Sequence, residues 1–266
     1  MEFFQILTLA VVQGVTEFLP ISSSGHLILA PRLFGFADQG LTLDVAVHLG
    51  SLIAVVSYFR QDVVAIFGGW LTALAPGGTQ TQESRLGWAV LIGVLPVIFA
   101  GALLKQIVEN DFRSAALIAA TTIGFGLLLG WADSSARRER QLSEITLRDG
   151  FFIGLAQILA LIPGTSRSGV TMTAALMLGM TREAASRFSF LLAIPTILGS
   201  SVFVSIELLR NEVTADWQSL GLGVVLSAIS AYICIHLFLR FIERIGMWPF
   251  VIYRLILGTV IIAFMI

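Results

Sequence analysis

Residues 151–171 have the sequence FFIGLAQILALIPGTSRSGVT, in which an apolar run ends at Pro163-Gly164 and gives way to hydroxyls and one arginine. Residues 151–162 would form roughly 18 Å of helix at about 1.5 Å per residue. A hydrocarbon core is about 30 Å thick, so this helix would end near its middle. A chain that stops there and turns back is a re-entrant hairpin, and irregular backbone at that depth must be buried in protein or line a wet cavity.

A second polar stretch, near the N-terminus, is similar to the first. Residues 13–26 have the sequence QGVTEFLPISSSGH, where a proline and three serines again interrupt apolar chain. An offset of 144 positions superimposes four identical pairs: Gln13 on Gln157, Ser22 on Ser166, Ser24 on Ser168 and Gly25 on Gly169. Polar clusters inside a membrane are costly and mark functional sites. The duplication therefore predicts one site built by two halves of an internal repeat.

The composition predicts an integral membrane protein. The 266 residues are 56% hydrophobic and only 12% charged, where a soluble domain has about 25% charged residues. Six windows are apolar enough to cross a bilayer: Leu41–Phe59, Leu86–Leu104, Ser114–Trp131, Phe188–Ile206, Leu220–Leu239 and Met247–Ile266. The net charge of −1, without a basic run, argues against a nucleic-acid partner. The N-terminus lacks a basic segment, so no cleaved signal peptide is expected.

The most polar segment divides the chain near its middle. We expect one membrane domain, 1–266, with repeat halves at about 1–133 and 149–266 joined by a polar loop at 134–148. Arginine-rich loops prefer the cytoplasm, so both termini are expected outside. The predicted fold is an all-α inverted-repeat bundle with about six spanning helices and two re-entrant helix pairs. The apolar stretch Val63–Ala75 is too short to span and is expected to be interfacial or a partial helix.

The second polar stretch has the chemistry of an anion site. Pro163-Gly164 ends one half-helix, and Ser166 or Ser168 can cap the next. The N-terminus of a helix attracts anions, and the guanidinium of Arg167 matches phosphate oxygens. The candidate substrate-binding residues here are Gly164, Thr165, Ser166, Ser168 and Thr171.

The first polar stretch supplies the complementary groups. Gln13 and Glu17 are four positions apart and share a helix face. Their amide and carboxylate oxygens suit a hard cation, Mg²⁺ or Ca²⁺, of the kind that clamps a pyrophosphate. The serines at 22–24 are candidate nucleophiles, and His26 is a candidate proton carrier. Together the two stretches predict phosphoryl transfer.

Further polar groups lie in the apolar windows. Asp44 and His48 are four positions apart, and a buried hydrogen-bonded pair is favoured over a pair that lines the cavity or flanks the metal. Arg254 could anchor at the interface or reach the pocket. The lone Cys234 excludes an intrachain disulfide and is expected to be a small core residue.

Both motifs resemble those of a known family. Q-x-x-x-E-F-L-P-x-S-S-S-G-H at 13–26 and P-G-x-S-R-S-G-x-T at 163–171 resemble the signatures of the bacterial undecaprenyl-pyrophosphate phosphatase family, of the bacitracin-resistance type. The likeness covers essentially the whole chain, including Arg182–Pro195 and Phe250–Arg254.

The resemblance implies an enzyme that removes the terminal phosphate of a polyprenyl pyrophosphate carrier with the aid of Mg²⁺ or Ca²⁺ and recycles it for cell-wall synthesis. It also implies a site that opens to the outer face of the bacterial inner membrane, commonly in a homodimer. By motif match, Glu17 would be the essential acid, Ser23 the nucleophile, His26 the proton carrier and Arg167 the phosphate clamp. The pocket would be lined by Ser22, Ser166 and Thr171.

The chain departs from the family pattern at one position, because the first acidic residue of the motif is Gln13 here. One carboxylate remains, which argues against a mechanism that needs two from this helix. The sequence leaves open whether Ser23 is phosphorylated or whether a water activated by His26 or Glu17 attacks directly. Inverted repeats with broken helices also occur in transporters, so a transporter or flippase of a lipid-linked phosphate is the alternative function.

Overall fold

The computed structural model of the protein describes residues 2–23, 25–27, 35–36, 40–111, 114–210 and 216–265. The secondary-structure elements of these residues are helices, which confirms the prediction of an all-α fold. Ser24, a member of the repeat and a candidate nucleophile, lies outside the described residues.

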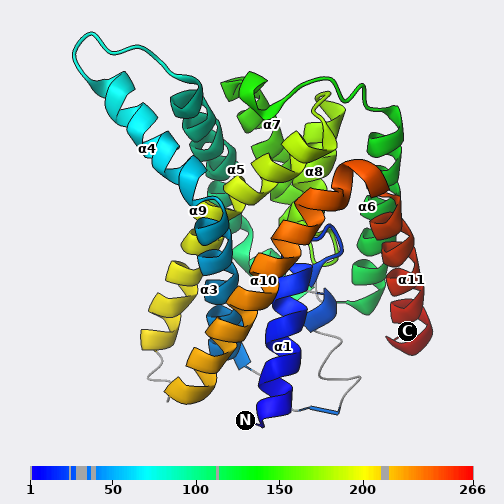
Figure 1. The fold of residues 1–266 in the computed structure, drawn as a ribbon. Helices are drawn as coiled ribbons and strands as arrows, with labels where there is room; N and C mark the ends of the chain where they lie inside the picture. The colour runs from blue at the N-terminus through cyan, green and yellow to red at the C-terminus, as the bar shows by residue number, and fades with distance from the viewer. Residues whose placement is uncertain are drawn as a thin grey trace.

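The first half of the chain forms one short helix that stops inside the bundle, one that projects from it, and three long ones (Figure 1). These are α1 (Phe3–Thr16), α3 (Gly40–Tyr58), α4 (Arg60–Leu74), α5 (Gln82–Asp111) and α6 (Ala115–Ser135). Thr16 ends α1 just before Glu17, inside the polar stretch 13–26. The chain therefore leaves its helix where its sequence becomes polar.

The second half begins with two short helices that form a hairpin and continues with three longer ones. Its elements are η1 (Leu142–Glu144), α7 (Leu147–Gln157), η2 (Ile158–Leu161), α8 (Arg167–Met177), α9 (Arg182–Arg210), α10 (Trp217–Ile245) and α11 (Trp248–Met265). The half-helix predicted at 151–162 starts earlier than expected, because Thr146 and Asp149 form a capping box in front of it. It tightens into a 3₁₀ turn before Pro163.

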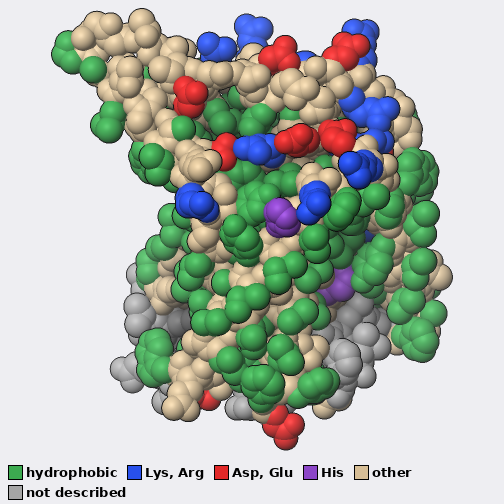
Figure 2. Space-filling model, in the orientation of Figure 1, with side chains coloured by type: hydrophobic (Ala, Val, Ile, Leu, Met, Phe, Trp, Pro, Cys, Tyr) green, Lys and Arg blue, Asp and Glu red, His purple; other side chains and the backbone are tan. Residues whose placement is uncertain are grey.

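Five helices are long and apolar enough to cross a membrane: Gly40–Tyr58, Gln82–Leu104, Ala115–Ser135, Arg182–Ile206 and Trp217–Ile245. They coincide with five of the six predicted windows. The sixth window forms α11, whose 18 residues make a helix about 27 Å long. The helix α4 is not among the five, as predicted for residues 63–75. Figure 2 shows charged side chains gathered at the linker end above a broad apolar band, which is the pattern of a membrane protein.

The helices α1 and α7 enter the bundle from opposite ends and stop near its middle (Figure 1). Both termini lie at the end from which α1 starts, and the polar linker lies at the other end. The loop that follows α1 touches the start of α8, where the Ser168 hydroxyl donates to the Leu19 carbonyl at 2.8 Å. Two broken helices therefore bring the two polar stretches together, while the inverted repeat itself remains a prediction.

Candidate active site

The Glu17 carboxylate joins the two polar stretches. It follows the last turn of α1 and is buried, with 8% of the residue exposed. Its Oε1 accepts a hydrogen bond from Arg167 Nη2 at 2.9 Å. Its Oε2 accepts from Gln13 Nε2 and from Ser23 Oγ, each at 3.0 Å. The structure thus brings four predicted site residues into contact: Gln13, Glu17, Ser23 and Arg167.

Arg167 is held between the two halves of the site. It is the first residue of α8, where unpaired backbone N–H groups give the helix end a partial positive charge. While Nη2 binds Glu17, Nη1 donates to the Ser189 carbonyl of α9 at 3.0 Å. The Ser189 hydroxyl in turn lies 2.7 Å from Thr171 Oγ1, so the predicted pocket residue Thr171 supports the clamp from behind.

Two serines that the repeat superimposes share an unusual backbone conformation. Ser22 has φ of 73° and Ser166 has φ of 71°, in the left-handed region that L-residues rarely adopt. Ser166 caps α8, because its hydroxyl accepts from the Gly169 N–H at 3.2 Å. A positive φ at both of these positions is a local feature that the two loops share.

The second loop needs a glycine where it packs against α6. Gly164 has φ of 89°, and a Cβ there would lie 2.5 Å from the Ile118 carbonyl oxygen. Next to it, Thr165 is fully buried, and its hydroxyl has no hydrogen-bond partner among the described residues. A buried hydroxyl without a partner is costly, and it suits a site that receives a polar ligand or a water.

Arg254, which the sequence left unassigned, connects both loops to the rest of the bundle. Arg254 belongs to α11, and its side chain is completely buried in the bundle. It donates to carbonyl oxygens of α6 and of both loops: Thr122, Gly164 and Thr165 at 3.0 Å, Pro20 at 3.3 Å and Thr121 at 3.4 Å. These hydrogen-bond partners are neutral carbonyl oxygens, so they leave its positive charge in place beside that of Arg167.

His26 lies at the edge of the site and contacts Tyr253. Its Nδ1 is 2.7 Å from the Ser22 carbonyl oxygen, and its Nε2 is 2.5 Å from the Tyr253 hydroxyl. The two rings stack at an interplanar angle of 9°. The Ser23 hydroxyl donates to Glu17, so the atom in position to take a proton from Ser23 is a carboxylate oxygen. The role of His26 as proton carrier stays a prediction.

His48 lies beside the site, which the sequence analysis had considered as the less favoured alternative for the Asp44 and His48 pair. Its Nδ1 is 2.6 Å from the main-chain oxygen of Asp44, so the two residues are hydrogen-bonded as expected, but the prediction that the pair is buried was wrong, because both are partly exposed. Its Nε2 points the other way and lies 3.8 Å from Glu17 Oε2. The signal was an ionisable residue in an apolar window, which marks a functional site by default. Helical spacing alone could not show which helix it faces.

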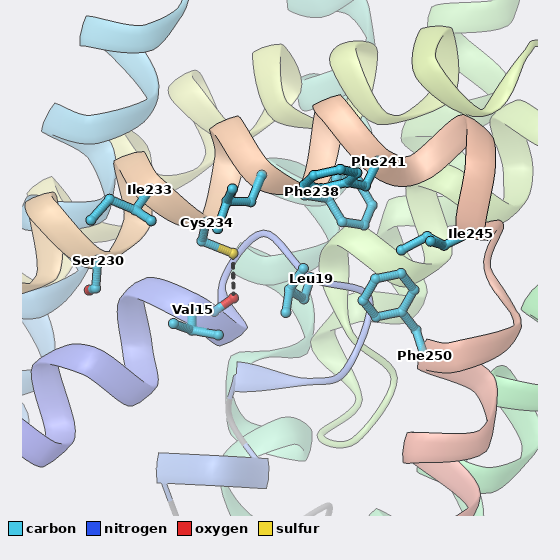
Figure 3. A pocket seen from close by; sticks show the side chains of 10 residues that line it. Val15, Leu19, Ser230, Ile233, Cys234, Phe238, Phe241, Ile245 and Phe250 are labelled. Carbon is cyan, nitrogen blue, oxygen red and sulfur yellow. Dashed lines mark hydrogen bonds between the residues drawn. The ribbon is translucent and has the colours of Figure 1, made fainter.

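An apolar groove runs from the site along the side of the bundle between α1, α10 and α11 (Figure 3). One part, of about 470 Å³, is lined by residues of all three helices, including Val15, Cys234 and Phe241. A second part, of about 500 Å³, reaches His26 and Tyr253. Val15, Leu19 and Phe250 line both parts, so the two form one surface that ends at His26, at the edge of the site.

Comparison with known proteins identifies the family of this chain. Residues 6–260 match the model of the family described as bacitracin resistance protein BacA. This chain belongs to the BacA family. The region matched to BacA includes both loops and also Tyr253 and Arg254, the two residues of α11 that contact them.

Curated relatives of this BacA-family chain are similar over nearly the whole length. A protein of Stutzerimonas stutzeri named undecaprenyl-diphosphatase 2 is 56% identical over 265 residues, which cover 98% of each chain. The undecaprenyl-diphosphatase of Nitrosococcus oceani is 55% identical over 261 residues, again 98% of each chain. That of Alteromonas mediterranea is 54% identical over 264 residues and 99% of each chain.

Proposed function

We propose that the protein is a membrane hydrolase that converts undecaprenyl pyrophosphate to the monophosphate and inorganic phosphate. This reaction recycles the lipid carrier for cell-wall synthesis and confers resistance to bacitracin. The observation that carries the proposal is the contact of Arg167, Glu17 and Ser23 at the meeting point of two broken helices. The relatives named undecaprenyl-diphosphatase, about 55% identical over the full chain, support the same substrate.

Arg167 and the N-terminus of α8 bind the phosphate. The guanidinium presents two N–H groups in a fork that matches phosphate oxygens, and the helix N-terminus adds its partial positive charge. Arg254 lies behind the second loop and donates there to neutral carbonyl oxygens, so it adds positive potential. The hydroxyls of Ser166, Ser168 and Thr171 complete the polar wall.

Ser23 is the nucleophile of the reaction, and Glu17 is its base. Ser23 Oγ bonds to the terminal phosphorus as its proton passes to Glu17 Oε2, which is 3.0 Å away, and the lipid monophosphate leaves with the electron pair of the broken P–O bond. Water then attacks the phosphoserine, inorganic phosphate leaves, and the proton on Glu17 returns to Ser23. A serine with a carboxylate base in contact favours this route over direct attack by water.

A divalent cation, Mg²⁺ or Ca²⁺, fits the site beside Glu17 and Gln13. The Gln13 Oε1 is buried without a hydrogen-bond partner among the described residues, so it is an oxygen available to an ion next to the carboxylate. The described residues contain no cluster of three His, Cys, Asp or Glu side chains that would form a cage. Such a set suits an ion that completes its coordination with substrate phosphates and water and neutralises phosphate charge.

The lipid tail lies in the apolar groove beside α1, and the site opens outward. The groove ends at His26, so a pyrophosphate in the polar site would have its isoprenoid chain leave along Leu19 and Phe250. The arginine-rich linker end favours the cytoplasm. The end from which α1 enters then faces the periplasm, and the apolar sides of the bundle leave room for a homodimer.

The experiment is phosphate release by the purified, detergent-solubilised protein from undecaprenyl pyrophosphate, with and without chelator. We expect cation-dependent release that is lost in Arg167→Ala and Glu17→Ala and kept in Arg244→Ala, a change to an exposed arginine outside the site. Binding of the lipid without release, in folded and cation-supplied protein, would contradict the proposal and favour the transporter or flippase.

A further inference from the structure

The orientation of the His48 ring is set by its own helix. Nδ1 lies 2.6 Å from the Asp44 carbonyl oxygen, which can only accept, so Nδ1 carries the hydrogen. In the neutral ring the lone pair is then on Nε2. A histidine that ligates a metal through one nitrogen commonly donates the other N–H to a carbonyl or carboxylate in this way.

The free nitrogen faces the carboxylate at the centre of the site. Nε2 of His48 lies 3.8 Å from Glu17 Oε2, which is too long for a hydrogen bond. Two atoms that bind one cation at about 2.0 to 2.5 Å are themselves about 3 to 4 Å apart. Two lone pairs that face each other at this distance repel unless a positive charge lies between them.

A third polar group, the Gln13 amide, contacts the same Glu17 Oε2 atom. The Gln13 side chain is completely buried, and its Nε2 donates to Glu17 Oε2. Its Oε1, on the same amide group, has no hydrogen-bond partner among the described residues. A buried acceptor without a partner requires explanation, and an ion is one explanation. The His48 side chain is 31% exposed, so it is not sealed inside the protein core.

We propose that His48 Nε2 and Glu17 Oε2 are protein ligands of a divalent cation, beside the Gln13 amide. The inference rests on the proposed function, since phosphate oxygens complete the coordination. An imidazole nitrogen suits ions such as Mn²⁺, whereas Mg²⁺ and Ca²⁺ prefer oxygen. His48 therefore shifts the preference of this site toward Mn²⁺.

The test is pulsed electron paramagnetic resonance of Mn²⁺ bound to the full chain in detergent, without a histidine tag, with inorganic phosphate added. A nitrogen ligand produces ¹⁴N modulation of the Mn²⁺ echo. The chain has three histidines, so each is replaced in turn by glutamine. We expect modulation in the wild type, in His236→Gln and in His26→Gln, and none in His48→Gln. The affinity of His48→Gln for Mn²⁺ should fall at least about tenfold, the smallest loss usual for outer-shell partners.

Modulation that persists in His48→Gln, or that is missing from Mn²⁺-loaded wild-type protein, would overturn the inference. So would a wild type that binds no Mn²⁺. Phosphate release from undecaprenyl pyrophosphate, measured on the same preparation, separates the two proposals. Release without ¹⁴N modulation leaves the hydrolase and removes the His48 ligand. Modulation without release leaves the cation site and contradicts the hydrolase.

Discussion

Replacement of Arg254 by lysine should weaken both the fold and the reaction while it keeps the charge. Arg254 makes three hydrogen bonds of 3.0 Å to buried carbonyl oxygens and two longer ones of 3.3 and 3.4 Å. A lysine ammonium is a compact group and can keep about one of the three short bonds. Two buried carbonyls then lose a charged donor, at about 1 to 3 kcal/mol each, so we expect about 3 kcal/mol of lost stability.

The assay is thermal unfolding in detergent, followed by loss of the monodisperse peak in size-exclusion chromatography. About 3 kcal/mol corresponds to a fall in Tm of roughly 6 to 12 °C for a chain of this size. Phosphate release should fall about a hundredfold, because Pro20 and Gly164 shift on either side of the reacting groups. Arg240→Lys is the matched control, since Arg240 is exposed. Wild-type Tm and activity in Arg254→Lys would refute the claim that Arg254 holds the two loops together.

Three further changes test other parts of the structure. Ser23→Ala should slow phosphate release at least a thousandfold (an order-of-magnitude figure for loss of a nucleophile), and full activity would instead favour attack by water. Gly14→Ala should cost about 3 kcal/mol in thermal unfolding, because a Cβ there would lie 2.7 Å from the Ser227 carbonyl oxygen; an unchanged Tm would contradict this close packing. Burial acts to raise the pKa of Asp149, but hydrogen bonds from Arg140 and its own capping box outweigh it, so the pKa is lowered. The stabilisation by this carboxylate should therefore be complete above about pH 4 and lost as the pH falls below that value; Tm measured against pH should show this loss in the wild type and not in Asp149→Asn.

Much of the architecture could be predicted because a bilayer leaves few choices for the backbone. Apolar windows of spanning length form helices, and a short apolar run that ends at Pro163-Gly164 has to turn inside the protein. The contact of Glu17 with Arg167 was also predictable in outline, since two polar stretches in a membrane have to satisfy each other. The cap of α8 was predicted as Ser166 or Ser168, because a serine that precedes a helix can accept from its first N–H groups, and the structure shows Ser166 in this role.

The residues that the sequence did not assign depend on which helices pack together. His48 shows four-residue spacing to Asp44 within its own helix, and that local pattern concealed the contact with Glu17 on another helix. Arg254 and Tyr253 lie in the last helix, far along the chain from the loops that they contact. No periodicity carries that information, because it is set by long-range packing.

The position of Cys234 has a practical consequence. It is the only cysteine in the chain, and it lines the apolar groove with its thiol against the Val15 carbonyl oxygen. The unmodified protein therefore carries one thiol at the place proposed for the lipid tail, and its burial should make it react only slowly, with small apolar thiol reagents. The rate of labelling, compared with and without undecaprenyl phosphate, reports how full the groove is in a protein with no engineered residue.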